Sequence, residues 1–157
     1  MMINNKLIEV LNDLKEINND RVTGYEKAAE GTKNLDADLH TIFQSMAKDS
    51  RMYADELTQE LTKLGGGAAT GNTGKGKIYL FWMGIKANFS GSDRQTILES
   101  CEFGEDTVQR AYNAALASVS ELDATIGKMI TFQKASLKTS HKLVKNYRDA
   151  RWNLNAW

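Results

Sequence analysis

Apolar residues recur at alternating steps of four and three along four long stretches of the chain. The first stretch shows the pattern with Leu7, Leu11 and Leu14, and the second with Leu39 and Phe43. This spacing places apolar side chains on one face of a helix that packs against others in a bundle. The pattern predicts an all-α fold with four helices, over about residues 4–31, 36–64, 93–119 and 121–151.

Glycine residues separate the first two predicted helices from the last two. The chain has no proline, and six of its twelve glycines fall between Gly65 and Gly76. Glycine-rich stretches end helices and form connections. A short amphipathic helix is expected at about residues 78–89, within a crossover over residues 65–92. The sequence predicts one domain, residues 1–157, in which a long crossover joins two helical hairpins, as in the ferritin-like four-helix bundle.

Polar residues interrupt the apolar seams near the middle of the predicted helices. If the helices lie side by side, these residues form one polar layer inside the bundle. A buried charge must be paired and hydrogen-bonded, or it becomes neutral. The predicted layer contains Asn18 and Arg21 from the first helix, Ser50 and Tyr53 from the second, Glu105 from the third, and Lys138 and His141 from the fourth.

The order of helices and several local stretches resemble the rubrerythrin and ferritin-like superfamily. The resemblance is greatest to an uncharacterised bacterial four-helix-bundle family within it. It is carried by residues 17–28 (INNDRVTGYEKA), 84–87 (GIKA) and 101–106 (CEFGED), so it extends over nearly the whole chain. The resemblance implies a ferritin-like bundle but brings no established activity.

Di-iron members of that superfamily use one Glu from each of two helices and a Glu-x-x-His from each of the other two. By heptad register, the first Glu position falls on Asn18 and the second on Glu105. The two Glu-x-x-His positions fall on residues 50–53 (SRMY) and 138–141 (KTSH), so that only Glu105 and His141 are kept. The resemblance therefore implies a degenerate di-iron site.

We expect Arg21 to balance the charge of Glu105 in place of metal, with Tyr53 and His141 completing the hydrogen bonds. A cation inside the layer would repel metal ions directly. The alternative is a reduced metal site, because one His and a few carboxylates could hold a divalent ion weakly. Its ligands would be drawn from Asp20, Glu102, Glu105 and His141.

Composition narrows the choice of function. Acidic and basic residues balance at 20 each, which disfavours a nucleic-acid-binding surface. The single cysteine, Cys101, is expected to be a small buried residue. The sequence begins without a recognisable secretory signal, and its longest apolar run, at residues 78–85, is far shorter than the roughly 20 residues that span a bilayer. We expect a cytoplasmic protein without a transmembrane segment.

Large apolar side chains in the crossover and at the C-terminus are candidates for an interaction surface. The segment at residues 78–89 could cover its own bundle, or it could form a partner-binding or membrane-surface face. The C-terminal residues could fold back or dock on another copy, and tryptophan is enriched at interface hot spots. The candidate surface consists of Phe81, Trp82, Trp152, Leu154 and Trp157.

These observations predict a non-catalytic bundle protein that needs no cofactor and acts as a self-assembling or partner-binding module, with a homo-oligomer as the expected state. The alternative is a ferritin-like metal-binding oxidoreductase or metal-storage protein with a reduced site. The biological process and the partner do not follow from the sequence.

Overall fold

A computed structural model describes residues 2–65, 94–119 and 123–155, with side chains for residues 5–65, 94–119 and 123–150. This part of the chain contains four helices and no strand: α1 (Met2–Thr32), α2 (Ala37–Lys63), α4 (Arg94–Val119) and α5 (Ala124–Asn155). The predicted all-α class with four long helices is confirmed, and the predicted helix ends differ from the observed ones by four residues or fewer.

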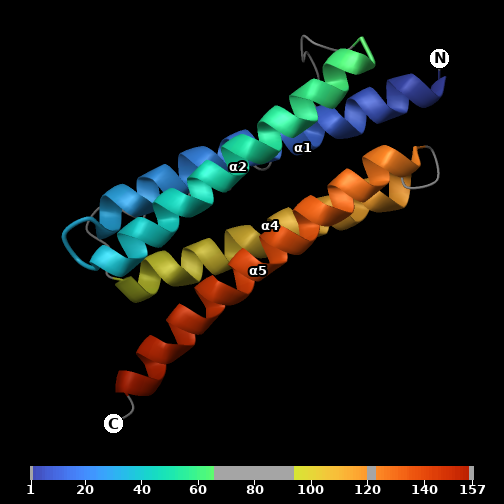
Figure 1. The fold of residues 1–157 in the computed structure, drawn as a ribbon. Helices are drawn as coiled ribbons and strands as arrows, with labels where there is room; N and C mark the ends of the chain where they lie inside the picture. Colours follow the sequence, from blue (N-terminus) through green and yellow to red (C-terminus); the bar gives the residue numbers. More distant parts are fainter. Residues whose placement is uncertain (1, 66–93, 120–122, 156–157) are drawn as a thin grey trace.

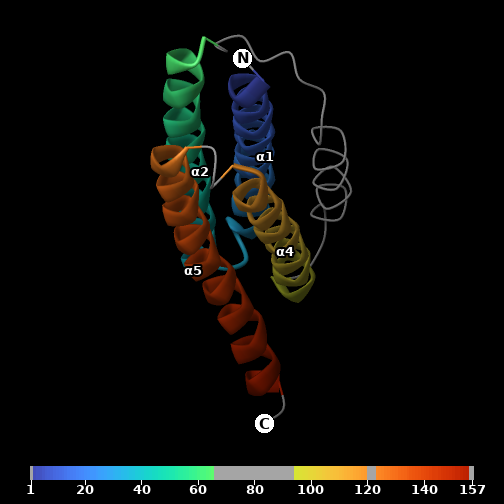
Figure 2. The same cartoon turned by 90° about the vertical axis from the view of Figure 1, so that its right-hand side faces the viewer.

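The helices form two antiparallel hairpins, α1 with α2 and α4 with α5 (Figure 1). Helix α1 lies against α4, whereas α2 and α5 make the smallest contact between the hairpins. The C-terminal part of α5 extends beyond the ends of the other helices (Figures 1 and 2). The four-helix arrangement therefore rests on two well-packed hairpins joined through a narrower interface.

The apolar seams predicted from the sequence form the core. Leu11, Phe43, Leu98 and Ile130, one from each helix, are fully buried. Burying side chains of this size stabilises the fold by about 1.5–3 kcal/mol each. Most of the buried polar side chains, among them Asn18, Arg21, Ser50, Glu105 and Gln133, lie in the middle stretches of their helices.

Helix ends are set by local polar groups and by one glycine. Asp36 caps α2, since its side chain accepts a hydrogen bond from the Leu39 amide at 3.1 Å. Gly65, with a φ of 81°, follows α2 in the left-handed region that glycine adopts without steric cost. Asp123 precedes α5 and caps it, since its Oδ1 accepts a hydrogen bond from the Ile126 amide at 3.0 Å.

Some predicted features lie outside the described residues. They include the crossover, its short helix at residues 78–89, and with them Phe81 and Trp82. Trp157 also lies outside, and the side chains of Trp152 and Leu154 at the end of α5 are not described. None of the helices in the described part of the chain is both long and apolar enough to cross a membrane.

Candidate functional site

A buried ion pair occupies the middle of the bundle. Arg21 on α1 and Glu105 on α4 are 0% and 1% exposed, respectively. The Arg21 Nε donates to Glu105 Oε1 at 2.5 Å, and Nη2 donates to Oε2 at 3.0 Å. This is the two-bond geometry that suits a guanidinium and a carboxylate. The pair predicted from the sequence is therefore present, and it links the two hairpins directly.

The remaining donors of Arg21 are directed at α2. Its Nη1 donates to Ser50 Oγ at 2.7 Å and to the Met46 carbonyl oxygen at 3.2 Å. The guanidinium carbon also lies 4.8 Å from the centre of the Tyr25 ring. With Nε and both terminal nitrogens hydrogen-bonded, the cation is held in one position by residues of three helices.

A second group of polar side chains lies next to the ion pair and takes one residue from each helix. Asn18 Nδ2 on α1 donates to Tyr112 Oη on α4 at 2.8 Å, and Tyr112 donates to Gln133 Oε1 on α5 at 2.7 Å. Gln133 Nε2 in turn donates to Glu56 Oε1 on α2 at 3.0 Å. Because Gln133 is buried and Glu56 is exposed, this chain of hydrogen bonds leads from the centre of the bundle to the α2 surface.

Burial and the charge of Glu105 shift the pKa values of three groups around the ion pair: Arg21, Tyr25 and Cys101. Burial disfavours the charged form of Arg21, but the charge and hydrogen bonds of Glu105 outweigh burial and raise the pKa of Arg21. Burial is the main reason that the pKa of Tyr25 is raised, and Glu105 adds to it. Burial, again with help from Glu105, also raises the pKa of the Cys101 thiol. None of these groups is suited to exchange protons near neutral pH or, in the case of Cys101, to act as a nucleophile.

Other residues predicted for the layer occupy different places. Tyr53 is buried, but its backbone oxygen accepts from Gln133 at 3.4 Å, and its hydroxyl is hydrogen-bonded to Ser136. The prediction that Tyr53 bonds to the ion pair is therefore wrong. Lys138 is exposed. It follows Leu137, and one step along a helix turns a residue by about 100° away from the seam.

The prediction that His141 completes the layer is also wrong. Its Nε2 lies 3.5 Å from Glu102 Oε1, and Arg148 Nη1 lies 3.0 Å from Glu102 Oε2, on the flank between α4 and α5. The seam of α5 reaches His141 only by two successive steps of four residues, and each such step rotates the side chain by about 40° around the helix. That drift carries His141 from the seam to its half-buried edge.

The four candidate ligands of the alternative metal site are not brought together in the described part of the chain. Glu105 is bonded to Arg21 through both oxygens, whereas Glu102 and His141 lie on the flank. Across the described residues, which include Asp20, no three His, Cys, Asp or Glu side chains are close enough together to share a metal ion. The donor set in the bundle centre consists of one carboxylate that is already neutralised, and it does not fit a di-iron centre.

Sequence reasoning did not assign a role to Tyr112, Gln133 or Glu56. Tyr112 follows Val108 by four residues and Gln133 follows Ile130 by three, so both continue the apolar spacing of their helices. A polar atom on an otherwise apolar line was the signal that could have identified them. Glu56 gave no such signal, because it lies beside the seam residue Leu57 on the exposed side of α2.

Comparison with known proteins identifies one family whose model matches the chain. A family model described as a domain of unknown function (DUF2383) matches residues 6–118, which include most of α1, all of α2 and all of α4 except Val119. No curated protein and no solved structure matches the chain. The match contains Arg21, Ser50 and Glu105, and it ends before Gln133.

Proposed function

The chain belongs to the DUF2383 family, whose description assigns no activity, and we propose that it is a non-catalytic bundle protein. In this proposal it acts through its surfaces, as a self-assembling or partner-binding module in the bacterial cytoplasm. Its central polar layer is the remnant of a ferritin-like di-iron site that no longer binds metal.

The observation that carries the proposal is the position of Arg21. Its guanidinium is fully buried and uses both oxygens of Glu105, the carboxylate that this proposal takes as the remaining ligand of the ancestral site. Two iron ions need several carboxylates to balance their charge, whereas a fixed cation repels them. The geometry favours a structural role for this layer, because the pair fastens one hairpin to the other.

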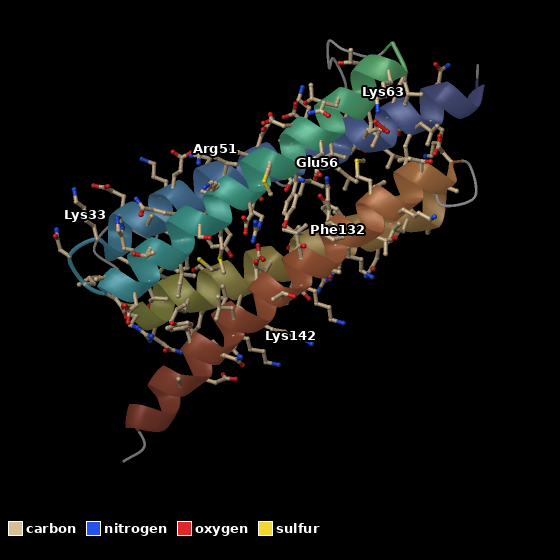
Figure 3. The ribbon with its side chains drawn as sticks, viewed as in Figure 1. Lys33, Arg51, Glu56, Lys63, Phe132 and Lys142 are labelled. Carbon is tan, nitrogen blue, oxygen red and sulfur yellow. The ribbon has the colours of Figure 1, made fainter. Side chains whose placement is uncertain are left out.

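Surface features support a role in assembly. Phe132 on α5 and Phe103 on α4 are 69% and 62% exposed (Figure 3 shows Phe132). Aromatic residues are enriched in protein interfaces. The chain ends with Trp152, Leu154 and Trp157, whose apolar surface would be buried by contact with a second copy. We expect a homo-oligomer.

The metal part of the proposal is tested by elemental analysis of protein purified from cells supplied with iron or manganese. We expect less than about one metal ion per ten chains, because Arg21 neutralises the carboxylate that an ion would need. The variants Glu105→Ala and His141→Ala serve as controls. Metal bound in a whole-number ratio and lost in both variants would support the ferritin-like oxidoreductase or storage alternative.

The assembly part is tested by sedimentation of the full chain and of a chain that ends at Arg151. Val144, the last buried core residue of α5 among the described side chains, is retained in the shorter chain. We expect the full chain to form oligomers and the shorter one to be monomeric. A full-length Trp152→Ser and Trp157→Ser double variant controls for the loss of helix length. Monomeric behaviour of both chains would contradict the role of the C-terminal residues.

A further inference from the structure

The four helices differ strongly in charge, although the chain as a whole is neutral. Helix α5 carries seven basic residues and one acidic residue. Each of the helices α1, α2 and α4 carries two more acidic than basic residues. The molecule therefore presents one basic helix beside three acidic ones, and a second copy would bring the opposite charge to either kind of surface.

Helix α5 has an exposed stripe with the spacing of a helix face that packs against another helix. Its members follow one another at steps of four and three residues. The α5 stripe consists of Lys128, Phe132, Ala135, Thr139 and Lys142, all of them exposed. Phe132 is 69% exposed, in the middle part of the stripe. The α5 stripe thus combines a large aromatic side chain with a positive charge at each end.

Helix α2 has a matching stripe of opposite charge. It follows the same alternation of four and three residues. The α2 stripe consists of Ser45, Asp49, Met52, Glu56 and Gln59, of which Asp49 is half-buried and the others are exposed. Met52 is 55% exposed and has a carboxylate on either side of it along the stripe. The α2 stripe thus combines one apolar side chain with negative charge.

The two stripes belong to the same side of the bundle. Helices α2 and α5 form one side, and α1 and α4 form the other (Figure 2). On the α2–α5 side the hairpins make their smallest contact with each other. The apolar surfaces of Met52 and Phe132 are therefore left open on a side where the bundle itself buries little.

Two contacts fix the heights of α2 and α5 along the bundle. The Tyr53 hydroxyl of α2 is hydrogen-bonded to Ser136 of α5, and Glu56 accepts from Gln133 at 3.0 Å. Residue numbers therefore rise along α2 as they fall along α5, so the two helices are antiparallel. Each residue adds about 1.5 Å to the height, which places every other member of the two stripes.

A two-fold axis parallel to the helices would bring α2 of one copy onto α5 of another without changing these heights. In a dimer of this symmetry each contact occurs twice. Asp49 then lies within about one helical turn of Lys142 on the second copy. Met52 falls at the height between Ala135 and Thr139, whose small side chains leave room for it. The charges and the sizes of the side chains therefore match in the same register.

A nucleic acid fits this side of the bundle less well than a second copy does. The lysines of α5 would attract phosphate groups. Asp49 and Glu56, however, lie on the same side and would repel them. A second copy of a neutral chain satisfies the acidic and the basic stripe together.

We propose that a second copy of this chain docks on the α2–α5 side, with the two-fold axis parallel to the helices. Each α2 stripe packs on the α5 stripe of the other copy, Asp49 pairs with Lys142, and Met52 and Phe132 become buried. The inference rests on the proposed self-association and names the surface that carries it. Helix α5 also contains Trp152 and Leu154, so one helix supplies both this surface and the C-terminal residues proposed for assembly.

Charge reversal on separate copies tests the proposal. In the full chain, Asp49→Lys or Lys142→Glu places like charges in both contacts of a symmetric dimer. Sedimentation equilibrium of either variant alone should show a Kd at least about tenfold higher than that of the wild-type chain. An equimolar mixture of the two variants should recover most of the association, because one contact then has the native pair and the other has the reversed pair. Mixing cannot restore an ion pair that forms within one chain.

Two control variants make the same charge changes outside both stripes. Lys27→Glu on α1 and Asp55→Lys on α2 are at exposed positions and should leave the Kd unchanged, alone or mixed. Circular dichroism checks that all variants are folded. A wild-type chain that is monomeric at every concentration would contradict the proposed self-association together with this inference. Stripe variants that associate like the controls, or a mixture that associates no better than its components, would overturn this inference alone.

A nucleic-acid probe tests the other occupant of the α5 stripe. The probe is a fluorescently labelled DNA duplex of about 20 base pairs, in about 0.15 M salt, and its anisotropy is measured as protein is added. We expect no binding by the wild-type chain. Binding that is weakened by Lys142→Glu and strengthened by Asp49→Lys would assign the α5 stripe to a polyanion and overturn the proposal.

Discussion

The Arg21 side chain is the most constrained residue of the molecule, because it is fully buried and still charged. Removing a charge from water is costly, and only excellent geometry compensates for it. Here the compensation comes from both oxygens of Glu105, from Ser50 and from the Met46 carbonyl. The bonds are directional, so they fix how α1 and α4 are rotated relative to each other, which apolar contacts would do less strictly.

Substitution of one partner of this pair is expected to be far more harmful than substitution of both. Arg21→Met or Glu105→Leu leaves an unpaired buried charge and should lower the free energy of unfolding by about 3–5 kcal/mol. The double variant Arg21→Met with Glu105→Leu replaces the pair by apolar groups and should lose less than either single variant. Urea denaturation of the four proteins measures this. Additive losses in the double variant would contradict coupling between the two side chains.

Helix ends depend on single polar side chains, and Asp36 serves two helices at once. It caps α2 through the Leu39 amide, and its other oxygen accepts from Arg94 at the start of α4. Arg94 also lies 5.9 Å from the centre of the Tyr147 ring on α5. One carboxylate therefore joins the turn after α1 to the beginning of the second hairpin.

Protonation of Asp36 is expected to weaken this junction in acid. Burial by itself would raise the pKa of Asp36, but the hydrogen bonds from Arg94 and the Leu39 amide outweigh it, and the pKa is lowered. A lowered folded-state pKa means that the stabilisation is complete above the unfolded pKa of about 3.9 and is lost as the pH falls through the folded value.

Two substitutions of Asp36 distinguish its role as a helix cap from its role in the ion pair with Arg94, and the first is Asp36→Ala. It removes the cap and the ion pair and should cost about 1–2 kcal/mol at pH 7. Asp36→Asn keeps the cap and should lose less. Denaturation curves measured between pH 7 and pH 3 give the free energy of unfolding of wild type and of Asp36→Asn. The difference between these two free energies should shrink below about pH 4. A difference that stays constant over this range would argue against ionised Asp36 as its source.

On the scale of the whole molecule, the two hairpins are held together unevenly. Helices α1 and α4 share an extended contact that includes the Arg21–Glu105 pair, whereas α2 and α5 touch little. On that weaker side, Gln133 of α5 bonds to Glu56 and to the Tyr53 carbonyl oxygen of α2. These bonds join the hairpins where apolar contact is smallest.

Replacing Gln133 by leucine is expected to loosen the contact of α5 with α4 and with α2. Gln133→Leu preserves volume but leaves the buried Tyr112 hydroxyl without its acceptor, which should cost about 1–3 kcal/mol. Amide hydrogen exchange should show reduced protection around residue 133 of α5 and in the facing part of α2. Adding Tyr112→Phe removes the orphaned hydroxyl and should recover part of the loss. Unchanged protection in α2 would show that Gln133 does not couple the hairpins.

The periodic pattern of apolar residues was sufficient to predict the four helices, most of the core and the pairing of Arg21 with Glu105. In a helix, residues spaced alternately by three and four positions lie on the same face. This holds for each helix on its own, because the spacing along the chain sets the direction of a side chain around the helix axis. A charge on such a face must then find an opposite charge on another helix, and Arg21 and Glu105 are opposite charges at central seam positions. These features required no knowledge of how the helices are rotated.

Tertiary structure decided which polar residues share the bundle centre. His141 lies outside the layer because two successive steps of four residues rotate it away from the buried face of α5. Gln133 lies in the layer because α5 crosses α2 near Tyr53 and Glu56. An apolar groove lined by Val10 and Leu14 of α1 and Ala111 and Ala115 of α4 likewise arises from two helices brought together by packing. Sequence periodicity sets the direction of a side chain about its own helix axis, whereas the rotation and offset between helices depend on all their contacts at once.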